Sequence, residues 1–340
     1  MRINLALQGG GAHGSFTWGV LDRLLEEPDL EIAAISGTSA GALNGAALKS
    51  GLVRGGHEAA RESLSWLWEQ VGAINDDRFA AWMAPFSPGL VSKSIEYSLP
   101  YTLTDMTSRM MSPYIYGDLF QNPLARIVDR FSFEAVCARA GPELFICATN
   151  VRTGKIRVFS GDQINTDAIL ASACLPTLFQ AVEIRDPKTR RLEAYWDGGY
   201  TGNPALFPLF APELPDDLVI VNINPLVREE LPKSPQEIQN RINEISFNSS
   251  LLRELRAISF VQRLISDEKM PSGAMKDVKV HMIADDDLMT ELSVATKIVP
   301  SPIILGKLKE AGRAAAQAFL RNDAPKLGKE SSVDLGAMFS

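Results

Sequence analysis

The sequence predicts an α/β protein in which helices cover both faces of a mainly parallel sheet. Short apolar runs alternate with stretches of helical periodicity over the first 70 or so residues, giving the order β-α-β-α. The chain has 340 residues, of which 46% are hydrophobic, and this is enough for a sizeable core. The length alone allows two domains, but the repeated β-α pattern favours one large domain.

The first elements follow directly from the apolar pattern. Residues 3–8 form an apolar run that ends in glycines, as a buried strand does where it enters a turn. Residues 13–26 carry apolar side chains at helical spacing, and 32–35 read as a second buried strand. Helices are expected at 40–49 and 58–71.

Residues 73–123 are rich in Trp, Phe, Tyr, Met and Pro and have weak periodicity. Two interpretations stay open. The segment is either an irregular connection packed on the core or a mobile cap or lipid-facing surface. Exposed apolar patches often mark surfaces of the second kind.

The second half continues the same alternation. The predicted strands are 144–149, 156–159, 192–196, 218–224 and 278–284. A short helix is expected at 166–173, a long one after the capping box Ser234-Pro235-Gln236-Glu237, and a last one from Ser301-Pro302 to about Leu320. Residues 1–321 are therefore expected to form a single domain, and the polar residues 322–340 a flexible tail.

Composition excludes several classes of protein. A net charge of −7 argues against nucleic acid as a partner, because phosphate binding needs a basic face. Cys137, Cys147 and Cys174 show no C-x-x-C spacing, so we expect neither a disulfide framework nor a metal site. No apolar stretch approaches the ~18 residues of a membrane span, and the first apolar run is too short for a signal peptide. The expected compartment is the cytosol, with any membrane contact peripheral.

A candidate nucleophile lies at Gly37-Thr38-Ser39-Ala40-Gly41, between a predicted strand and a predicted helix. This matches G-x-S-x-G, in which the serine occupies a sharp turn that its neighbours permit only by lacking side chains. The following helix directs its first N–H groups at developing negative charge. The motif predicts Ser39 as a catalytic nucleophile.

The glycine-rich segment Gly9-Gly10-Gly11-Ala12-His13-Gly14 follows the first strand. It also satisfies the dinucleotide pattern G-x-G-x-x-G, but that fold needs an acidic residue at the end of the second strand, and Glu31 lies at its start. The other use of such a loop is an oxyanion hole made by the backbone N–H groups of Gly10 and Gly11.

The general base is less evident from the residues themselves. The chain has three histidines. His281 lies within a predicted strand, which favours a packed or surface strand histidine, and His57 lies at a charged helix start, which favours a solvated one. His13 begins the helix beside the glycine loop, where it either supports oxyanion charge or is an ordinary helix-start or surface residue. Asp197-Gly198-Gly199 ends another predicted strand, yet aspartate before two glycines is also an ordinary turn signal. Both a carboxylate base and a histidine base remain open at this point.

Taken together, the three glycine-containing motifs resemble the patatin-like phospholipase family. They are Gly9 to Gly14, Gly37 to Gly41 and Asp197 to Gly199, in that order and each after a strand. Ala171-Ser172-Ala173-Cys174-Leu175-Pro176 and Asn203-Pro204 are also similar to segments of that family. The resemblance covers residues 4–204 and implies a three-layer α/β/α fold.

The resemblance also implies a function. It makes Ser39 the nucleophile, Asp197 its base without a histidine, and Gly10 and Gly11 the oxyanion hole, with no metal or other cofactor. The substrate would be a phospholipid, lysophospholipid or neutral lipid at a membrane or lipid-droplet surface. The tryptophan and methionine residues of the segment 73–123 suggest either an apolar wall for an acyl chain or ordinary core; they are Trp82, Met83, Met106, Met110 and Met111. One departure is His13, where many members carry lysine or arginine; histidine is charged only part of the time near neutral pH.

Three alternatives remain open at this stage. One is a Ser-Asp-His esterase that uses His281, another is a lipid-binding scaffold without turnover, and the third is a nucleotide-binding module.

Overall fold

The computed structural model describes all residues except 76–85, 99–111, 116–121, 188, 272 and 340. Within the described residues, eight strands form one sheet. They are β1 (Arg2–Leu7), β2 (Glu31–Thr38), β3 (Glu143–Asn150), β4 (Ile156–Ser160), β5 (Val182–Arg185), β6 (Leu192–Asp197), β7 (Asp217–Val221) and β8 (Lys279–Ile283).

The sheet is parallel over its central strands. Followed through their hydrogen-bonded pairs, the strands connect as β5-β6-β3-β2-β1-β7-β8, and β4 also pairs with β3. Strands β3, β2, β1, β7 and β8 run parallel to one another, whereas β4 and β6 pair with β3 in the antiparallel sense and β5 pairs with β6 in that sense. The carboxyl ends of the parallel strands therefore meet at one edge, where sites in such folds lie.

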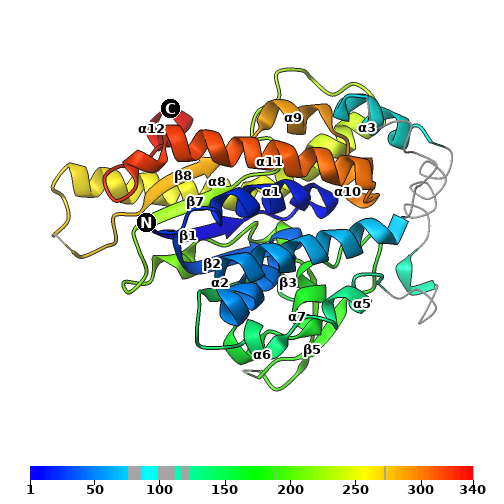
Figure 1. Ribbon diagram of the computed structural model, residues 1–340, viewed down its shortest axis with the longest axis horizontal. Helices are drawn as coiled ribbons and strands as arrows, with labels where there is room; N and C mark the ends of the chain where they lie inside the picture. Colours follow the sequence, from blue (N-terminus) through cyan, green and yellow to red (C-terminus); the bar gives the residue numbers. More distant parts are fainter. Residues whose placement is uncertain (76–85, 99–111, 116–121, 188, 272, 340) are drawn as a thin grey trace.

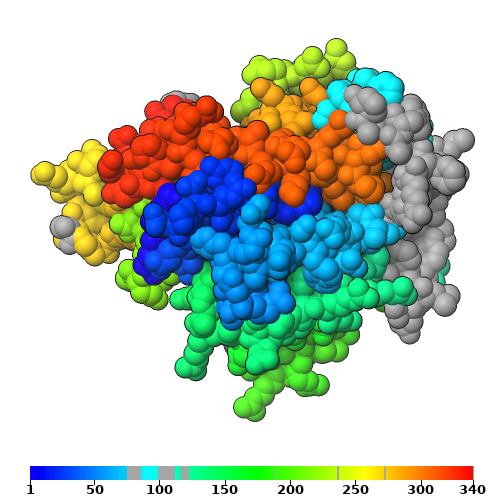
Figure 2. All heavy atoms as spheres, viewed as in Figure 1, coloured from blue at the N-terminus to red at the C-terminus, as the bar shows by residue number. Residues whose placement is uncertain are grey.

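Helices cover both faces of this sheet (Figure 1). The helices among the described residues are α1 (Gly14–Leu24), α2 (Ala40–Gly72), α3 (Pro88–Glu96), α5 (Ala125–Val128), α6 (Phe133–Val136), α7 (Thr166–Ser172), α8 (Pro235–Ser266), α9 (Asp286–Glu291), α10 (Val294–Ile298), α11 (Pro302–Asn322) and α12 (Leu335–Met338). In Figure 2 the near face is formed by α1, α2 and α11, coloured blue, light blue and orange-red. Helix α8 lies behind the sheet in Figure 1.

The alternation of side chains along β1 separates the two layers. Ile3, Leu5 and Leu7 belong to the core cluster formed with α1, α2 and α11. Ala6 points the other way, into the cluster that contains Leu251 and other α8 residues. The three-layer α/β/α fold predicted from the sequence is confirmed.

The structure adds detail where the apolar pattern was weak. The two helices expected at 40–49 and 58–71 are the halves of α2, which is broken by non-helical backbone at Gly55 and Gly56. Strand β5 and helices α9 and α10 had no clear signal in the sequence. In the segment 73–123, the described parts include α3, and the five residues expected to form an acyl-chain wall lie outside the described residues.

The segment after Asn322, for which the composition predicts a flexible tail, lies against β7 and β8. The Gly328 N–H donates to Asp217 (2.9 Å), and Ser331 Oγ accepts from Val280 N–H (3.0 Å). These bonds are made largely by backbone groups, which a polar composition does not reveal. The division of the chain at residue 321 stays a prediction.

Two further expectations concern membranes and cysteines. Among the described residues, no helix is both long and apolar enough to cross a bilayer. All three cysteines are free thiols; Cys147 and Cys174 are buried and Cys137 is half-buried.

Helices α1 and α11 approach so closely that glycine is required at their contact. A Cβ at Gly312 would lie 2.0 Å from the carbonyl oxygen of Phe16. We expect Gly312→Ala to lower the free energy of unfolding by about 1–3 kcal/mol or more, as overpacked sites do. Thermal or urea unfolding measures this effect. Gly306→Ala is the matched control, because it is in the same helix with nothing within 4 Å of its Cβ position. Equal stability of the two variants would contradict this packing.

Candidate active site

Ser39 occupies the turn between β2 and α2. Its backbone has φ 54° and ψ −120°, a left-handed conformation that costs energy for a residue with a side chain. A Cβ at Gly41 would lie 2.0 Å from the Leu7 carbonyl oxygen, and one at Gly37 would lie 2.5 Å from the Gly41 carbonyl oxygen. The two glycines of the motif are therefore required by close backbone packing, and they allow Ser39 its strained position.

The backbone of Ser39 is held by a serine at the end of α7. Ser39 N–H donates to Ser172 Oγ (2.9 Å), and Ser172 Oγ donates to the Cys147 carbonyl oxygen (2.6 Å). Ser172 belongs to the small-residue segment noted in the sequence, which gave no role to its hydroxyl. The structure indicates that this hydroxyl joins β3 to the turn that carries Ser39.

Strand β3 brings Asp197 to Ser39. Cys147 pairs with Thr38 of β2, and the next residue, Ala148, pairs with Asp197 of β6. Strand β4 also pairs with both of these β3 residues. Because a strand has only two edges, β4 occupies one edge of β3, and β2 and β6 follow one another along the other edge. A Cβ at Gly198 would lie 2.9 Å from Thr38 Cγ2 and 2.2 Å from the Cys147 carbonyl oxygen, so this junction leaves room only for glycine.

The Asp197 carboxyl group is buried, with 1% of the residue exposed. Burial raises its pKa to about 7, against hydrogen bonds from Gly199 N–H and the Ser39 side chain, which favour the charged form. The bond from Gly199 N–H to Oδ1 is 2.7 Å long. An aspartate with this pKa is half-deprotonated near neutral pH and is a stronger base than an ordinary aspartate.

The glycine loop lies against the same serine. A Cβ at Gly9 would lie 2.7 Å from Ser39 Cβ. The Gly9 N–H donates to Asn203 Oδ1 (2.6 Å), and its carbonyl oxygen accepts from Asn224 Nδ2 (2.8 Å). Within the described part of the chain, the N–H groups of Gly10 and Gly11 donate to no protein acceptor. They are therefore available to an oxygen atom of a ligand.

Two more glycines of this loop, Gly11 and Gly14, lie so close to neighbouring helices that a side chain would not fit. Gly11 has φ 58°, and a Cβ there would lie 2.2 Å from the carbonyl oxygen of Lys297 in α10. A Cβ at Gly14 would lie 2.5 Å from Ala40 Cβ at the start of α2. The loop is thus fixed between α10 on one side and the Ser39 turn on the other.

His13 lies at the start of α1, as a helix-start residue does, but with 1% of the residue exposed it is not a surface residue. Its Nε2 lies 2.7 Å from Thr296 Oγ1, whose proton goes to the Ser293 carbonyl oxygen (2.7 Å), so Nε2 is the donor. Burial, assisted by the charge of Lys297, holds the pKa of His13 well below its usual value. His13 is therefore neutral at neutral pH and supplies no charge to the loop.

His281 lies away from this site. Its ring is fully buried in β8, with Nε2 3.1 Å from Asp217 Oδ1 and Nδ1 3.2 Å from Ser332 Oγ. Asp217 begins β7, at the end of that strand opposite to the one beside Ser39. The contacts of His281 therefore join the last residues of the chain to the sheet.

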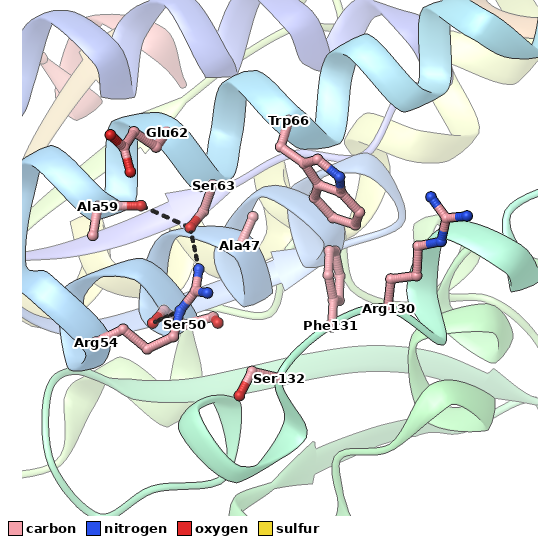
Figure 3. A pocket seen from close by; sticks show the side chains of 10 residues that line it. All are labelled: Ala47, Ser50, Arg54, Ala59, Glu62, Ser63, Trp66, Arg130, Phe131 and Ser132. Atoms are coloured by element: carbon pink, nitrogen blue, oxygen red, sulfur yellow. Dashed lines mark hydrogen bonds between the residues drawn. The ribbon is translucent and has the colours of Figure 1, made fainter.

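A separate cavity of about 440 Å³ lies along α2 (Figure 3). Its lining comes from both halves of α2 and from residues 130–132, and it includes Trp66, Phe131 and the Arg54–Ser63 pair, in which Arg54 Nη2 donates to Ser63 Oγ (2.7 Å). None of the residues placed around Ser39 lines this cavity.

A three-layer α/β fold with a serine on a strained strand-to-helix turn, beside a buried carboxylate and free backbone amides, is typical of acyl hydrolases. The chain belongs to the patatin-like phospholipase family, whose model matches residues 5–210. The resemblance seen in the sequence motifs is thereby confirmed, and membership in this family supports a lipid acyl hydrolase.

Comparisons with known proteins give the following further matches. VipD from Legionella pneumophila is 16% identical, with a TM-score of 0.40 over 94% of this chain and 66% of that chain. The ExoU–SpcU complex of Pseudomonas aeruginosa gives 16% identity and a TM-score of 0.29, over 95% and 60% of the two chains. The chain therefore spans less than two thirds of either matched structure. No curated protein sequence matches it.

Proposed function

We propose that the protein hydrolyses carboxyl esters of phospholipids, lysophospholipids or neutral lipids through an acyl-enzyme on Ser39, with Asp197 as the base. The observation that carries the proposal is the burial of the Asp197 carboxylate beside the Ser39 turn, where a hydrogen bond with the Ser39 side chain acts on its pKa. The free N–H groups of Gly10 and Gly11 supply the third element that the reaction needs. Gly37, Gly41, Gly198 and Gly199 support it by close packing.

The proposed reaction has two steps. Asp197 takes the proton of Ser39 as Oγ attacks the ester carbonyl carbon, and the Gly10 and Gly11 N–H groups receive the charge on the carbonyl oxygen. Protonated Asp197 then gives its proton to the alcohol as the C–O bond breaks, leaving the acyl-enzyme. Water, deprotonated by Asp197, attacks the acyl carbon, and Ser39 leaves with the proton while the fatty acid is released.

The substrate class is best tested with a series of esters. We expect the wild-type protein to hydrolyse p-nitrophenyl esters of rising chain length, and phospholipid and lysophospholipid vesicles in a second assay. Ser39→Ala serves as the blank in both assays. Hydrolysis at the membrane surface would fit a peripheral enzyme. Binding of vesicles without any ester hydrolysis would instead favour the lipid-binding scaffold.

The His281→Ala variant tests the other alternative. Full activity is expected in this variant, and loss of activity with the fold intact would favour a Ser-Asp-His esterase.

The raised pKa of Asp197 predicts the acid limb of the pH profile. The base must be deprotonated, so kcat/KM for a short soluble ester is expected to rise with pH through about 7, the pKa of Asp197. An unburied aspartate would place this limb near ~4. Initial rates between pH 4 and 9 measure it. A limb near 4, or none in this range, would contradict a buried aspartate as the base.

A further inference from the structure

A lysine from the C-terminal part of the chain lies behind the glycine loop. Helix α10 packs on the segment Gly11–His13 (Figure 1). The Lys297 carbonyl oxygen contacts Gly11, and its Nζ donates to Asn224 Oδ1 (2.8 Å). Among the described residues, no carboxylate lies within ion-pair distance of this ammonium group.

Asn224 connects the ammonium group to the loop. While its Oδ1 accepts from Lys297, its Nδ2 donates to the Gly9 carbonyl oxygen (2.8 Å) and to Gln8 Oε1 (3.1 Å). The Gly9 carbonyl and the Gly10 N–H belong to one peptide group. Hydrogen bonds in a chain polarise one another, so a cation at one end makes the last N–H a better donor. Here that last N–H is the one at Gly10.

The surrounding charges leave the field of Lys297 largely uncancelled at the loop. Glu244 of α8 faces it but is bound by Arg228 (2.6 Å) and Arg241 (3.3 Å). His13, on the other side, is neutral. Burial and the charge of Arg228 lower the pKa of Lys297 to about 8, against the charge of Glu244. The ammonium group is therefore mostly protonated at neutral pH.

We propose that Lys297 is a positioning residue for the oxyanion hole: through Asn224, its ammonium group orients and polarises the Gly9–Gly10 peptide, whose N–H receives the charge of the tetrahedral intermediate. This inference rests on the proposed hydrolase function. It explains how a loop that carries a neutral His13 obtains a cationic environment from a residue more than 280 positions away in the sequence.

Lys297→Met and Lys297→Arg test this inference with a short soluble ester. Wild-type kcat is expected to fall with rising pH above about 8, as Lys297 loses its proton. Lys297→Met should reduce kcat roughly 10- to 100-fold, which is a smaller loss than removal of a direct oxyanion donor causes. Its KM should change little, and its kcat–pH profile should have no alkaline limb. Lys297→Arg should retain activity and shift the limb to higher pH, because guanidinium stays charged. Lys269→Met, at a side chain that is 65% exposed, is the control and should match wild type.

The outcomes separate this inference from the proposed function. An inactive wild type, or a Ser39→Ala variant as active as wild type, would overturn the proposed function itself. If these two behave as proposed but Lys297→Met keeps kcat within twofold, or keeps the same alkaline limb, Lys297 has no such role. If thermal unfolding shows that Lys297→Met is not folded, the test rests on the alkaline limb of the kcat–pH profile of Lys297→Arg. A limb at the same pH as in the wild type would overturn the inference.

Discussion

Ser39→Ala is expected to abolish ester hydrolysis, with a loss in kcat of about 10⁴-fold or more, because the acyl-enzyme cannot form without the hydroxyl. The fold should survive, since the Ser39 N–H keeps its bond to Ser172 Oγ and only one oxygen atom is lost. Initial rates on a p-nitrophenyl ester measure the loss, and thermal unfolding checks the fold.

Ser65→Ala is the matched control for this experiment. Ser65 also lies on α2, but its hydroxyl donates to Glu69 (3.0 Å) on a half-buried part of the helix. Activity of Ser65→Ala should equal that of wild type. A folded Ser39→Ala variant with even a tenth of wild-type activity would show that another group is the nucleophile.

Asp197→Asn is expected to have two opposite effects. Activity should fall about 10³- to 10⁴-fold, because an amide cannot take the Ser39 proton. Stability at pH 8 should rise. The pKa of Asp197 is about 7 in the folded protein against a usual 3.8, so the folded protein holds a proton that the unfolded chain loses between these values. Stability of the wild type therefore falls as pH rises from about 4 to about 7, and stays lower above that range.

The size of the stability effect follows from the pKa difference. At ~1.4 kcal/mol per pKa unit, the charged carboxylate costs at most about 4 kcal/mol above pH 7. Asparagine carries no charge and keeps an oxygen to accept from Gly199 N–H, so most of this cost should disappear. Urea unfolding at pH 4 and pH 8 measures it: the two proteins should be similar at pH 4 and differ at pH 8. An Asp197→Asn variant that is less stable than wild type at pH 8 would contradict a costly buried charge.

The turn that carries Ser39, the proposed nucleophile, could be predicted from the sequence because its signal is local. Gly37, Ser39 and Gly41 lie within five residues, between a strand and a helix that both have clear apolar patterns. The meeting of Ser39 with Asp197 could not be derived in this way. It depends on Thr38 and Asp197 pairing with consecutive residues of β3, a long-range register that has no local signal in the sequence. Only the family resemblance indicates that Asp197 acts on Ser39.

The surroundings of the glycine loop could not be predicted at all. Asn224 and Lys297 are single polar residues in no motif, more than 200 positions away from the loop they contact. The burial of His13 has no signal in the sequence, because α10, which supplies its partner Thr296, is only five residues long and has no clear periodicity. Short helices that pack through backbone contact and small residues leave little trace in a hydrophobic pattern.

The most direct test of the central claim is covalent labelling with a fluorophosphonate, followed by peptide mass spectrometry to locate the adduct. At pH 8 we predict a single adduct on Ser39 in the wild type, and a labelling rate at least tenfold lower in Asp197→Asn, since that variant cannot deprotonate the serine. An adduct on a different residue, or Ser39 labelled equally fast in both proteins, would contradict the assignment of Ser39 and Asp197 as nucleophile and base.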